Sequence, residues 1–302
     1  MKHLLTIQDL EPKKILELLN LADQLKYEQK HGIQHHHLAG KTLGMIFQKA
    51  STRTRVSFET GMYQLGGHAL FLSGRDLQIG RGEPVQDTAR VLSRYLDGIM
   101  IRTFAQKEVE DLANYGTIPV INGLTDYCHP CQILADLMTI REVKGRLEGL
   151  KMCYLGDGNN MANSLIAGGI KTGMTVSVAT PKGYEPNAQV MEYAKANGNF
   201  TLTTDVLAAA ADADVVITDV WASMGQEKEA AQRKAAFAGV YQINSTVMAA
   251  AKENAMVLHC LPAHREEEIT AEVFEAHAKE IFEEAENRLH AQKAVMVELM
   301  AN

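Results

Sequence analysis

Short apolar strand patterns alternate with helical patterns along almost the whole chain, and this alternation limits the possible folds more than any other feature. Helical patterns such as residues 83–96 and 186–198 separate the strand patterns. Strands that alternate with helices predict βαβ units and parallel sheets. The expected strands are residues 41–47, 68–72, 97–102, 117–122, 151–157, 175–180, 213–219 and 255–260.

The length of 302 residues suits two domains, each with a core of its own. A long helical pattern at residues 129–147 falls mid-chain and is expected to bridge them. We therefore expect an α/β chain of two doubly wound parallel-sheet domains joined by interdomain helices. The expected domains are residues 1–133 and 134–285, with the amphipathic C-terminal helix, residues 286–302, packing back on the first.

Composition and charge exclude several classes of protein. No apolar run approaches the roughly 20 residues of a membrane span, so no membrane partner is expected. The first 20 residues include Asp9, Glu11 and Glu17, which indicates a first helix rather than a signal peptide. The four cysteines show no disulfide-scaffold spacing, so a reduced, cytoplasmic setting is expected. A net charge of −7 argues against nucleic acid as a partner, and an anionic substrate would need a locally basic pocket.

The segment KASTRTRVSF, residues 49–58, has the features of an anion-binding helix start. Ser51 is a good N-cap residue, and an apolar helical stripe follows it. Thr52, Arg53 and Thr54 then occupy the first turn, where free N–H groups and the helix dipole favour a phosphate or a carboxylate. An arginine there is unfavourable for an empty helix but suits a helix that binds a dianion. The alternative is an ordinary cap with solvated arginines.

Two further segments of the first half add donors. Arg102 ends a strand pattern, and ligands of open α/β sheets bind outside the carboxyl ends of strands, so Arg102 can share the anion with Arg53. His129 precedes Pro130, a favoured first helical residue, and Gln132 lies one turn further on. His129 and Gln132 can together donate to a carbonyl oxygen. A salt bridge is the alternative role for Arg102.

The second half also places polar residues after its strands. The stretch LGDGNN, residues 155–160, opens a helix but lacks G-x-G-x-x-G, and its asparagines suit a small polar ligand better than a pyrophosphate. Asp219 ends a later strand and can bind an ammonium group. Cys260 ends the last strand as a possible reactive thiol, although buried packing is the commoner role of a lone cysteine.

Two clusters contain metal-binding residue types, but neither is expected to hold a metal. The run HHH at residues 35–37 lies in a loop pattern with no added carboxylate or cysteine nearby in the sequence. Cys128 and Cys131 give one C-x-x-C spacing, and the chain has no second such pair. We expect no metal and no cofactor.

Six motifs occur together in the order and spacing of one family. They are STRTR (51–55), DLQIGRGE (76–83), HPCQ (129–132), GDGNN (156–160), DVWASMG (219–225) and HCLPAHR (259–265). On these motifs the chain resembles the ornithine carbamoyltransferases over essentially its full length. STRTR alone is typical of carbamoyltransferases, whereas HPCQ together with SMG and HCLP points to ornithine. No motif position departs from the pattern of that family.

The resemblance implies a role for each matched residue. Catalysis would depend on Arg53, Arg102, His129, Asp219 and Cys260. Carbamoyl phosphate would contact Ser51, Thr52, Arg53, Thr54, Gln78, Arg102, His129, Gln132, Cys260, Leu261 and Arg288. Ornithine would contact Asn160, Asp219, Ser223 and Met224.

The resemblance also implies the reaction and the assembly. The carbamoyl group of carbamoyl phosphate would pass to the side-chain amine of L-ornithine, giving L-citrulline and phosphate by direct amine attack. Cys260 is not expected to act as a covalent nucleophile, because carbamoyl phosphate is already activated. The family implies a homotrimer or a multiple of trimers. Residues 221–236 are expected to form a loop that closes as a lid after ornithine binds.

Three other functions stand beside this one. A sister carbamoyltransferase using another amine would differ at residues 219–225. A nicotinamide-dependent oxidoreductase is disfavoured because Gly156 and Gly158 are not followed by the third glycine of G-x-G-x-x-G. A non-catalytic subunit would be expected to have lost one of the proposed catalytic residues, and none is lost. The biosynthetic or catabolic role, assemblies beyond the trimer, the binding order and the proton acceptor stay open.

Overall fold

The protein divides into two compact α/β units. The computed structural model describes residues 1–223 and 225–301. The first unit comprises Met1–Ala135 and Asn287–Asn302, and the second comprises Asp136–Glu286. The sequence-based domains were expected at 1–133 with 286–302, and at 134–285.

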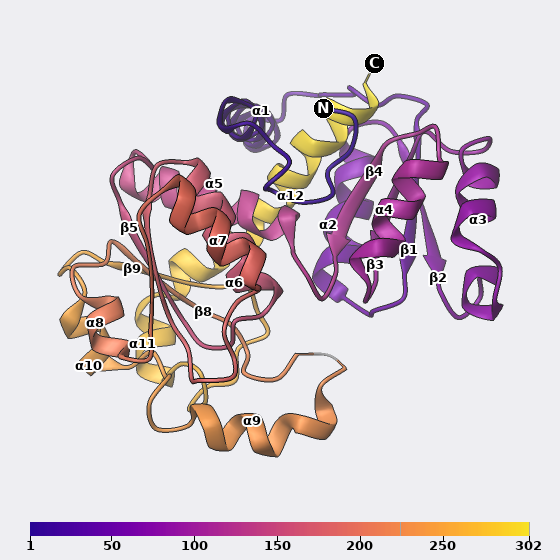
Figure 1. The fold of residues 1–302 in the computed structure, drawn as a ribbon. Coiled ribbons are helices and arrows are strands. Elements are labelled where there is room, and N and C mark those ends of the chain that lie inside the picture. Colours follow the sequence, from indigo (N-terminus) through magenta and orange to yellow (C-terminus); the bar gives the residue numbers. More distant parts are fainter. Residues whose placement is uncertain (224, 302) are drawn as a thin grey trace. The chain divides into compact units, whose positions relative to one another are not determined.

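A parallel four-stranded sheet forms the centre of the first unit, with strand order β2-β1-β3-β4 (Figure 1). Its elements are α1 (Pro12–Lys30), β1 (Thr42–Phe47), α2 (Thr52–Gln64), β2 (His68–Ser73), the 3-10 helix η1 (Gln78–Arg81), α3 (Val85–Leu92), β3 (Gly98–Arg102), α4 (Gln106–Tyr115) and β4 (Val120–Leu124).

Helices cover both faces of this sheet. Ala89 of α3 and Val109 of α4 pack with Ile46 and Ile101 in one apolar cluster, which covers one face. On the other side, α2 packs against the end of the C-terminal helix, where an added Cβ at Gly61 would lie 2.9 Å from Met296. Strands covered on both faces are buried and mostly apolar, and the residues of β3 and β4 are all buried.

A parallel five-stranded sheet forms the centre of the second unit, with strand order β7-β6-β5-β8-β9. Its elements are β5 (Lys151–Leu155), α6 (Asn160–Lys171), β6 (Thr175–Ala179), α7 (Ala188–Asn197), β7 (Phe200–Thr203), α8 (Val206–Ala210), β8 (Val215–Thr218), the 3-10 helix η2 (Glu227–Glu229), α9 (Ala230–Phe237), α10 (Ser245–Ala250), β9 (Met256–His259) and α11 (Ala271–Ala276). Two longer helices, α5 (Pro130–Lys144) and α12 (Ala278–Met300), contribute residues to both units.

Both sheets are doubly wound, which confirms the expected fold class. In each sheet the chain runs outward on one side and then returns to add strands on the other, so the order reverses once. The reversal lies between β1 and β3 in the first sheet and between β5 and β8 in the second. Ligands of open α/β sheets bind outside the carboxyl ends of the strands at such a reversal. Both halves of the chain therefore have a fold-determined position for a site.

Three sequence expectations need correction. The described residues form nine strands where eight were expected, and the apolar pattern missed β7 of the second sheet because Phe200–Thr203 is short, threonine-rich and only partly buried. The first helix starts at Pro12, since residues before it pair with the sheet edge: Leu4 N–H donates to the Val120 carbonyl at 2.9 Å. The expected loop 221–236 is not a loop throughout, because η2 and α9 occupy its second half.

Candidate active site

The first unit gathers arginines and hydroxyls at the reversal point of its sheet. Strand register pairs Phe47, the last residue of β1, with Arg102, the last residue of β3. The Arg102 carbonyl accepts from the Gln48 N–H at 2.9 Å, which ties the start of the loop after β1 to the end of β3. The α2 N-terminus therefore begins beside buried Arg102.

Ser51 caps α2 as expected. Its side chain accepts from the Thr54 N–H at 3.2 Å, and its hydroxyl lies 3.1 Å from Thr54 Oγ1. Arg288, a buried residue of α12, donates from Nη2 to Thr54 Oγ1 at 2.9 Å. The Thr54 hydroxyl accepts from both neighbours, which leaves its own hydrogen for another oxygen.

His129 lies buried just before α5 and is surrounded by positive charge. Burial lowers its pKa well below the usual value, and the nearby charges of Arg288, Arg102 and Arg53 lower the pKa further. His129 is therefore a neutral imidazole at neutral pH. The charges of three guanidinium groups from three separate elements act on this ring, and such a concentration of positive charge suits a bound dianion.

The remaining predicted residues of the first unit divide into two groups. Gln132 is buried in the first turn of α5, next to His129, and Thr52 is exposed at the start of α2. Gln78 lies exposed on η1, and none of the described hydrogen bonds involves its side chain. The structure thus groups the charges of Arg53 and Arg102 around His129, and the Gln78 contact stays a prediction.

The second unit centres on Asp219, which directly follows β8. Asn159 Nδ2 donates to Asp219 Oδ2 at 2.8 Å, and the Val220 N–H donates to Oδ1 at 2.8 Å. The Cys260 thiol, just after β9, donates to Oδ1 at 3.1 Å. Asn159 also caps α6, since its Oδ1 accepts from the Met161 N–H at 2.9 Å. Residues after three neighbouring strands therefore hold one carboxylate in a fixed orientation.

Cys260 is a protonated thiol in this setting. Burial raises its pKa well above the usual value, and the negative charges of Asp219 and Glu284 raise it further. A thiolate is the nucleophilic form of cysteine, so Cys260 is a poor nucleophile here. It serves as a hydrogen-bond donor to Asp219.

Leu261 has a left-handed backbone, with φ of 58°, and a neighbouring histidine supports it. Its N–H donates to His259 Nδ1 at 2.9 Å, so that nitrogen is the acceptor and the proton of this buried ring lies on Nε2. His259 Nε2 in turn donates to Glu268 at 3.0 Å. His259 thus supports the loop that carries Cys260. Its role is structural, although it belongs to the motif HCLPAHR.

The structure describes two of the other three predicted ornithine residues. Asn160 is buried in the first turn of α6, and Ser223 is partly buried in the loop after Trp221. The Ser223 N–H donates to Gln226 Oε1 at 2.9 Å, which closes a tight turn there. Met224, the fourth predicted residue, lies outside the described residues.

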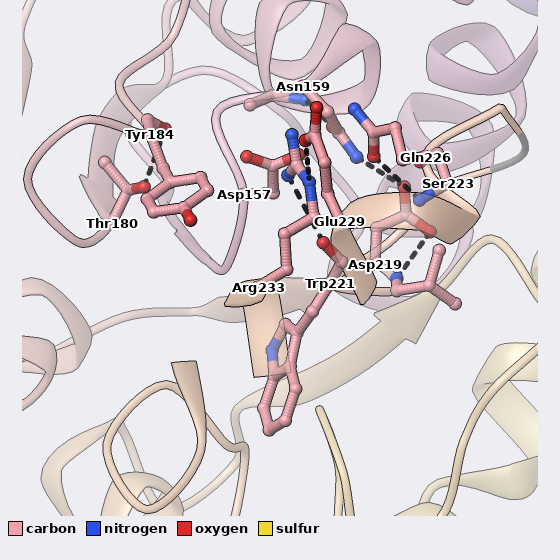
Figure 2. Close-up of polar contacts among 12 residues, drawn as sticks. Asp157, Asn159, Thr180, Tyr184, Asp219, Trp221, Ser223, Gln226, Glu229 and Arg233 are labelled. Carbon is pink, nitrogen blue, oxygen red and sulfur yellow. Dashed lines mark hydrogen bonds and ion pairs between the residues drawn. The ribbon is translucent and has the colours of Figure 1, made fainter. Parts of the chain in front are cut away.

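Sequence reasoning missed a buried ion pair beside this site. Arg233 of α9 donates from Nη1 to Asp157 Oδ2 at 2.8 Å and to the Trp221 carbonyl at 3.4 Å. Figure 2 shows the guanidinium between these groups, with Asp219 and Asn159 adjacent. Asp157 belongs to the motif GDGNN, which singled out its neighbours, but no local pattern joins it to a residue 76 positions away.

Gly158, between Asp157 and Asn159, is required by a close backbone approach. An added Cβ would lie 2.3 Å from the Glu185 carbonyl carbon, and the Gly158 N–H donates to the Tyr184 carbonyl at 2.8 Å. The loop after β5 is therefore held by backbone contact on one side and by side-chain contacts on the other.

The two sequence clusters with metal-binding residue types, Cys128/Cys131 and the run HHH, have surroundings of their own in the structure. Burial raises the pKa of the Cys128 and Cys131 thiols to about 12, which disfavours the thiolate that a metal needs. His35 Nδ1 lies 3.5 Å from Glu28, so the fold brings to the run HHH a carboxylate that its sequence neighbours do not supply. Within the described residues one His/Glu group has metal-like spacing, namely His264, Glu267 and Glu268.

Comparison with known proteins identifies the family. The model for the aspartate/ornithine carbamoyltransferase carbamoyl-P binding domain matches residues 2–142, and that for the Asp/Orn binding domain matches residues 148–299. The chain belongs to the aspartate/ornithine carbamoyltransferase family. The resemblance seen in the sequence motifs is thereby confirmed, and the chain is a carbamoyltransferase enzyme.

Relatives within the family are similar over their whole length. The chain is 59% identical over 301 residues to the ornithine carbamoyltransferase of Syntrophotalea carbinolica, covering 99% of each protein. The solved ornithine carbamoyltransferase of Pyrococcus furiosus is 53% identical, with a TM-score of 0.94 over 99% of this chain and 97% of that one. The anabolic ornithine carbamoyltransferase of Campylobacter jejuni is 42% identical, with a TM-score of 0.93 over 99% of each chain.

The described residues contain no helix that is both long and apolar enough to cross a membrane.

Proposed function

We propose that this chain catalyses the transfer of the carbamoyl group of carbamoyl phosphate to the side-chain amine of L-ornithine, giving L-citrulline and phosphate. The observation that carries the proposal is the contact of Arg288 Nη2 with Thr54 Oγ1 at 2.9 Å, which joins a guanidinium to the first turn of α2, beside a His129 ring whose pKa the charges of Arg288, Arg102 and Arg53 lower. That cluster suits a small dianion with an adjacent carbonyl. The full-length similarity to proteins named ornithine carbamoyltransferase supports the choice of the second substrate.

The phosphate of carbamoyl phosphate binds at the α2 N-terminus in this proposal. The first-turn N–H groups and the hydroxyls of Ser51, Thr52 and Thr54 donate to its oxygens. Arg53 and Arg102 neutralise its two negative charges. His129 is buried and neutral, so it donates one N–H to the carbamoyl oxygen without adding a further charge. Gln132 and Arg288 complete the donors around that oxygen.

Ornithine binds through the residues around Asp219. The Asp219 carboxylate is held by Asn159 and by the Cys260 thiol, so its orientation is set before the amine of ornithine arrives. A fixed carboxylate beside a neutral thiol suits an amino group. Asn160, Ser223 and Met224 supply further polar and apolar contacts to ornithine, and Cys260 and Leu261 border the carbamoyl group.

The reaction is a direct displacement. The lone pair of the neutral side-chain amine attacks the carbamoyl carbon, a C–N bond forms, and the C–O bond to phosphate breaks. The amine loses one proton and the phosphate leaves as the hydrogen phosphate dianion, so charge and protons balance. Negative charge builds up on the carbamoyl oxygen during attack, and the donors Arg102, His129 and Thr54 stabilise it.

Amine deprotonation and substrate positioning limit the rate. A free alkyl amine has a pKa of about 10.4, so only a small fraction is neutral at pH 7. Holding both substrates in reactive orientation can supply much of the acceleration. No electron or hydride is transferred, and we propose that no metal or redox cofactor takes part.

The assembly and compartment follow the family in this proposal. We expect a homotrimer, or a multiple of it, in the cytoplasm. Light scattering after gel filtration would then give a mass that is a multiple of three times the 33.2 kDa chain. A monomer or a dimer would contradict this part of the proposal.

A citrulline assay with a panel of amines tests the proposed substrate. Carbamoyl phosphate is offered with L-ornithine, putrescine, L-aspartate or N-acetyl-ornithine. Strong turnover on L-ornithine alone is the expected result. Preference for putrescine would keep the phosphate site and overturn the assignment of residues 219–225, and no turnover with any amine would overturn the proposed activity.

A further inference from the structure

A closed ring of contacts holds the loop that carries Ser223. The Ser223 N–H donates to Gln226 Oε1 at 2.9 Å, and the Glu229 N–H donates to the Gln226 carbonyl at 2.9 Å. Glu229 Oε2 accepts from Arg233 Nε at 3.2 Å. Arg233 Nη1 then returns to the Trp221 carbonyl at 3.4 Å. One guanidinium thus joins the residue before the loop to the helix after it.

The ring is attached to the rest of the second unit through Asp157. Arg233 Nη1 donates to Asp157 Oδ2 at 2.8 Å, and only 11% of the Arg233 side chain and 7% of the Asp157 side chain are exposed. Asp157 lies two residues before Asn159, which orients Asp219. The short loop after β5 therefore holds Asp219 with one residue and the Ser223 loop with another (Figure 2).

Aromatic packing fixes the position of the guanidinium. Arg233 lies over the Tyr184 ring, 5.2 Å from its centroid. Tyr184 packs edge-on against Phe237, whose ring also stacks on Trp221 at 5.9 Å. From this position Arg233 reaches Asp157 and the Trp221 carbonyl through Nη1 and Glu229 through Nε. A lysine has a single nitrogen and could not keep all three contacts in the same geometry.

We propose that Asp157 and Arg233 are positioning residues for the second substrate: their ion pair closes the base of the loop between Trp221 and Glu229 and sets the place of Ser223 relative to Asp219. This inference rests on the proposed function, in which Ser223 and Asp219 contact ornithine. The pair touches no reacting atom. It acts on ornithine affinity and leaves the carbamoyl phosphate cluster of the first unit unchanged.

The pair is expected to open in mild acid. Burial raises the pKa of Asp157 to about 6, the charge of Arg233 opposes that rise, and the charges of Asp219 and Glu229 add to it. These three groups face Asp157 from α9, from the end of β8 and from η2. Protonation below about pH 6 removes the negative charge, so the attraction to Arg233 weakens and the loop base loosens.

The test measures the two substrates separately in the full-length protein. The variants are Asp157→Asn, Arg233→Lys and Arg233→Met, with the double variant Asp157→Asn/Arg233→Met. The KM for ornithine should rise by about tenfold or more in each, while the KM for carbamoyl phosphate stays within about twofold. Because both residues act through one contact, the double variant should be no worse than the single ones.

Lys234→Ala provides a matched control on the same helix. Lys234 pairs with Glu267 at 2.6 Å, and its side chain is 60% exposed. This variant should leave both KM values unchanged. Equal rises in both KM values together with a lower melting temperature would show a merely structural role and overturn the proposal, as would an ornithine KM within about twofold of the parent protein.

The double variant guards against misfolding of a single variant. Breaking one partner of a buried pair leaves the other charge uncompensated, whereas replacing both is often tolerated. Hydrogen exchange in residues 221–229 gives a readout that needs no substrate. Exchange there should be faster in Asp157→Asn and Arg233→Met than in Lys234→Ala. Equal exchange would overturn the proposal that the Asp157–Arg233 pair holds the base of the loop, even if ornithine is not the substrate.

The pH response is measured with L-norvaline, whose propyl side chain carries no amine. Norvaline affinity should fall as the pH drops through about 6 in the parent protein and stay flat in Asp157→Asn. A flat profile in the parent protein would contradict the role of Asp157 charge. A parent protein that turns over no ornithine would instead overturn the proposed function. The exchange measurement would still decide whether the Asp157–Arg233 pair holds the base of the loop.

Discussion

Asn159 joins the start of α6 to Asp219, since its Nδ2 donates to the Asp219 carboxylate at 2.8 Å while its Oδ1 caps the helix. One side chain thus serves helix stability with its acceptor and site geometry with its donor. These two functions can be separated by substitution.

Asn159→Asp keeps the acceptor and removes the donor. An aspartate caps a helix about as well as an asparagine, so the cap is kept, and the free energy of unfolding should fall only through the repulsion between the new carboxylate and Asp219. The new carboxylate faces Asp219 and repels it, so kcat/KM for ornithine should fall by about tenfold or more. Asn159→Ala is the comparison, because it also loses the cap, at about 1 kcal/mol. An Asn159→Asp variant with unchanged kinetics would contradict this account of Asp219.

Arg53→Ala should remove most of the activity. Arg53 lies at the α2 N-terminus and contributes positive charge at His129, where the dianion is proposed to bind. Negative charge also builds up on the departing phosphate, and loss of one donor to developing charge costs about 100-fold to 1,000-fold in kcat. Steady-state kinetics with carbamoyl phosphate varied would measure it. Arg90→Ala, whose exposed ion pair with Asp87 lies on α3, is the control and should behave as the parent protein.

Cys260 should form no covalent intermediate. Burial and the charge of Asp219 raise the pKa of its thiol, so the thiolate is scarce at neutral pH. Intact mass spectrometry after mixing with carbamoyl phosphate alone should detect no carbamoylated protein. Cys260→Ala should lose no more than about 100-fold in kcat, whereas loss of a true nucleophile costs about a million-fold. A trapped carbamoyl-thioester would reverse this assignment.

His129 should remain neutral in mild acid. Burial and three arginine charges lower its pKa, so the native protein does not bind this proton near pH 6.5 while the unfolded chain does. The stabilising free energy should therefore fall as the pH drops below about 6.5, by up to about 1.4 kcal/mol per pH unit for this one group. Nitrogen NMR of labelled histidine, assigned with His129→Asn, would show an uncharged ring at pH 5.5. A ring that titrates near 6.5 would contradict the buried cluster.

The fold was largely predictable, because the inner strands of both sheets are buried and their sequences are mostly apolar. Strand β7 was not predicted because an edge strand of four residues, two of them threonines, is too short to give an apolar run. The first helix was misplaced because a short N-terminal segment pairs with the edge of β4, a contact 117 residues away in the chain. Local sequence patterns do not report such distant pairing.

The site was predictable where its residues follow strands and begin helices. The sequence pointed to Asn160 as an ornithine contact, which stays a prediction, and it did not point to its neighbour Asn159, which is bonded to Asp219. A sequence pattern does not show which of two adjacent asparagines is the N-cap of α6, because helix boundaries are its least certain part. The Arg233–Asp157 ion pair was not predicted for another reason, since the two residues belong to different elements.

Isotope-edited NMR tests the central claim most directly. Carbamoyl phosphate labelled with ¹³C at the carbonyl is mixed with L-ornithine labelled with ¹⁵N at the side-chain amine, and the new bond is read from ¹³C–¹⁵N coupling. The account predicts a coupled ureido carbonyl with the parent protein and almost none with Arg53→Ala. Label that remains in carbamoyl phosphate, or that appears on the α-nitrogen, would contradict it.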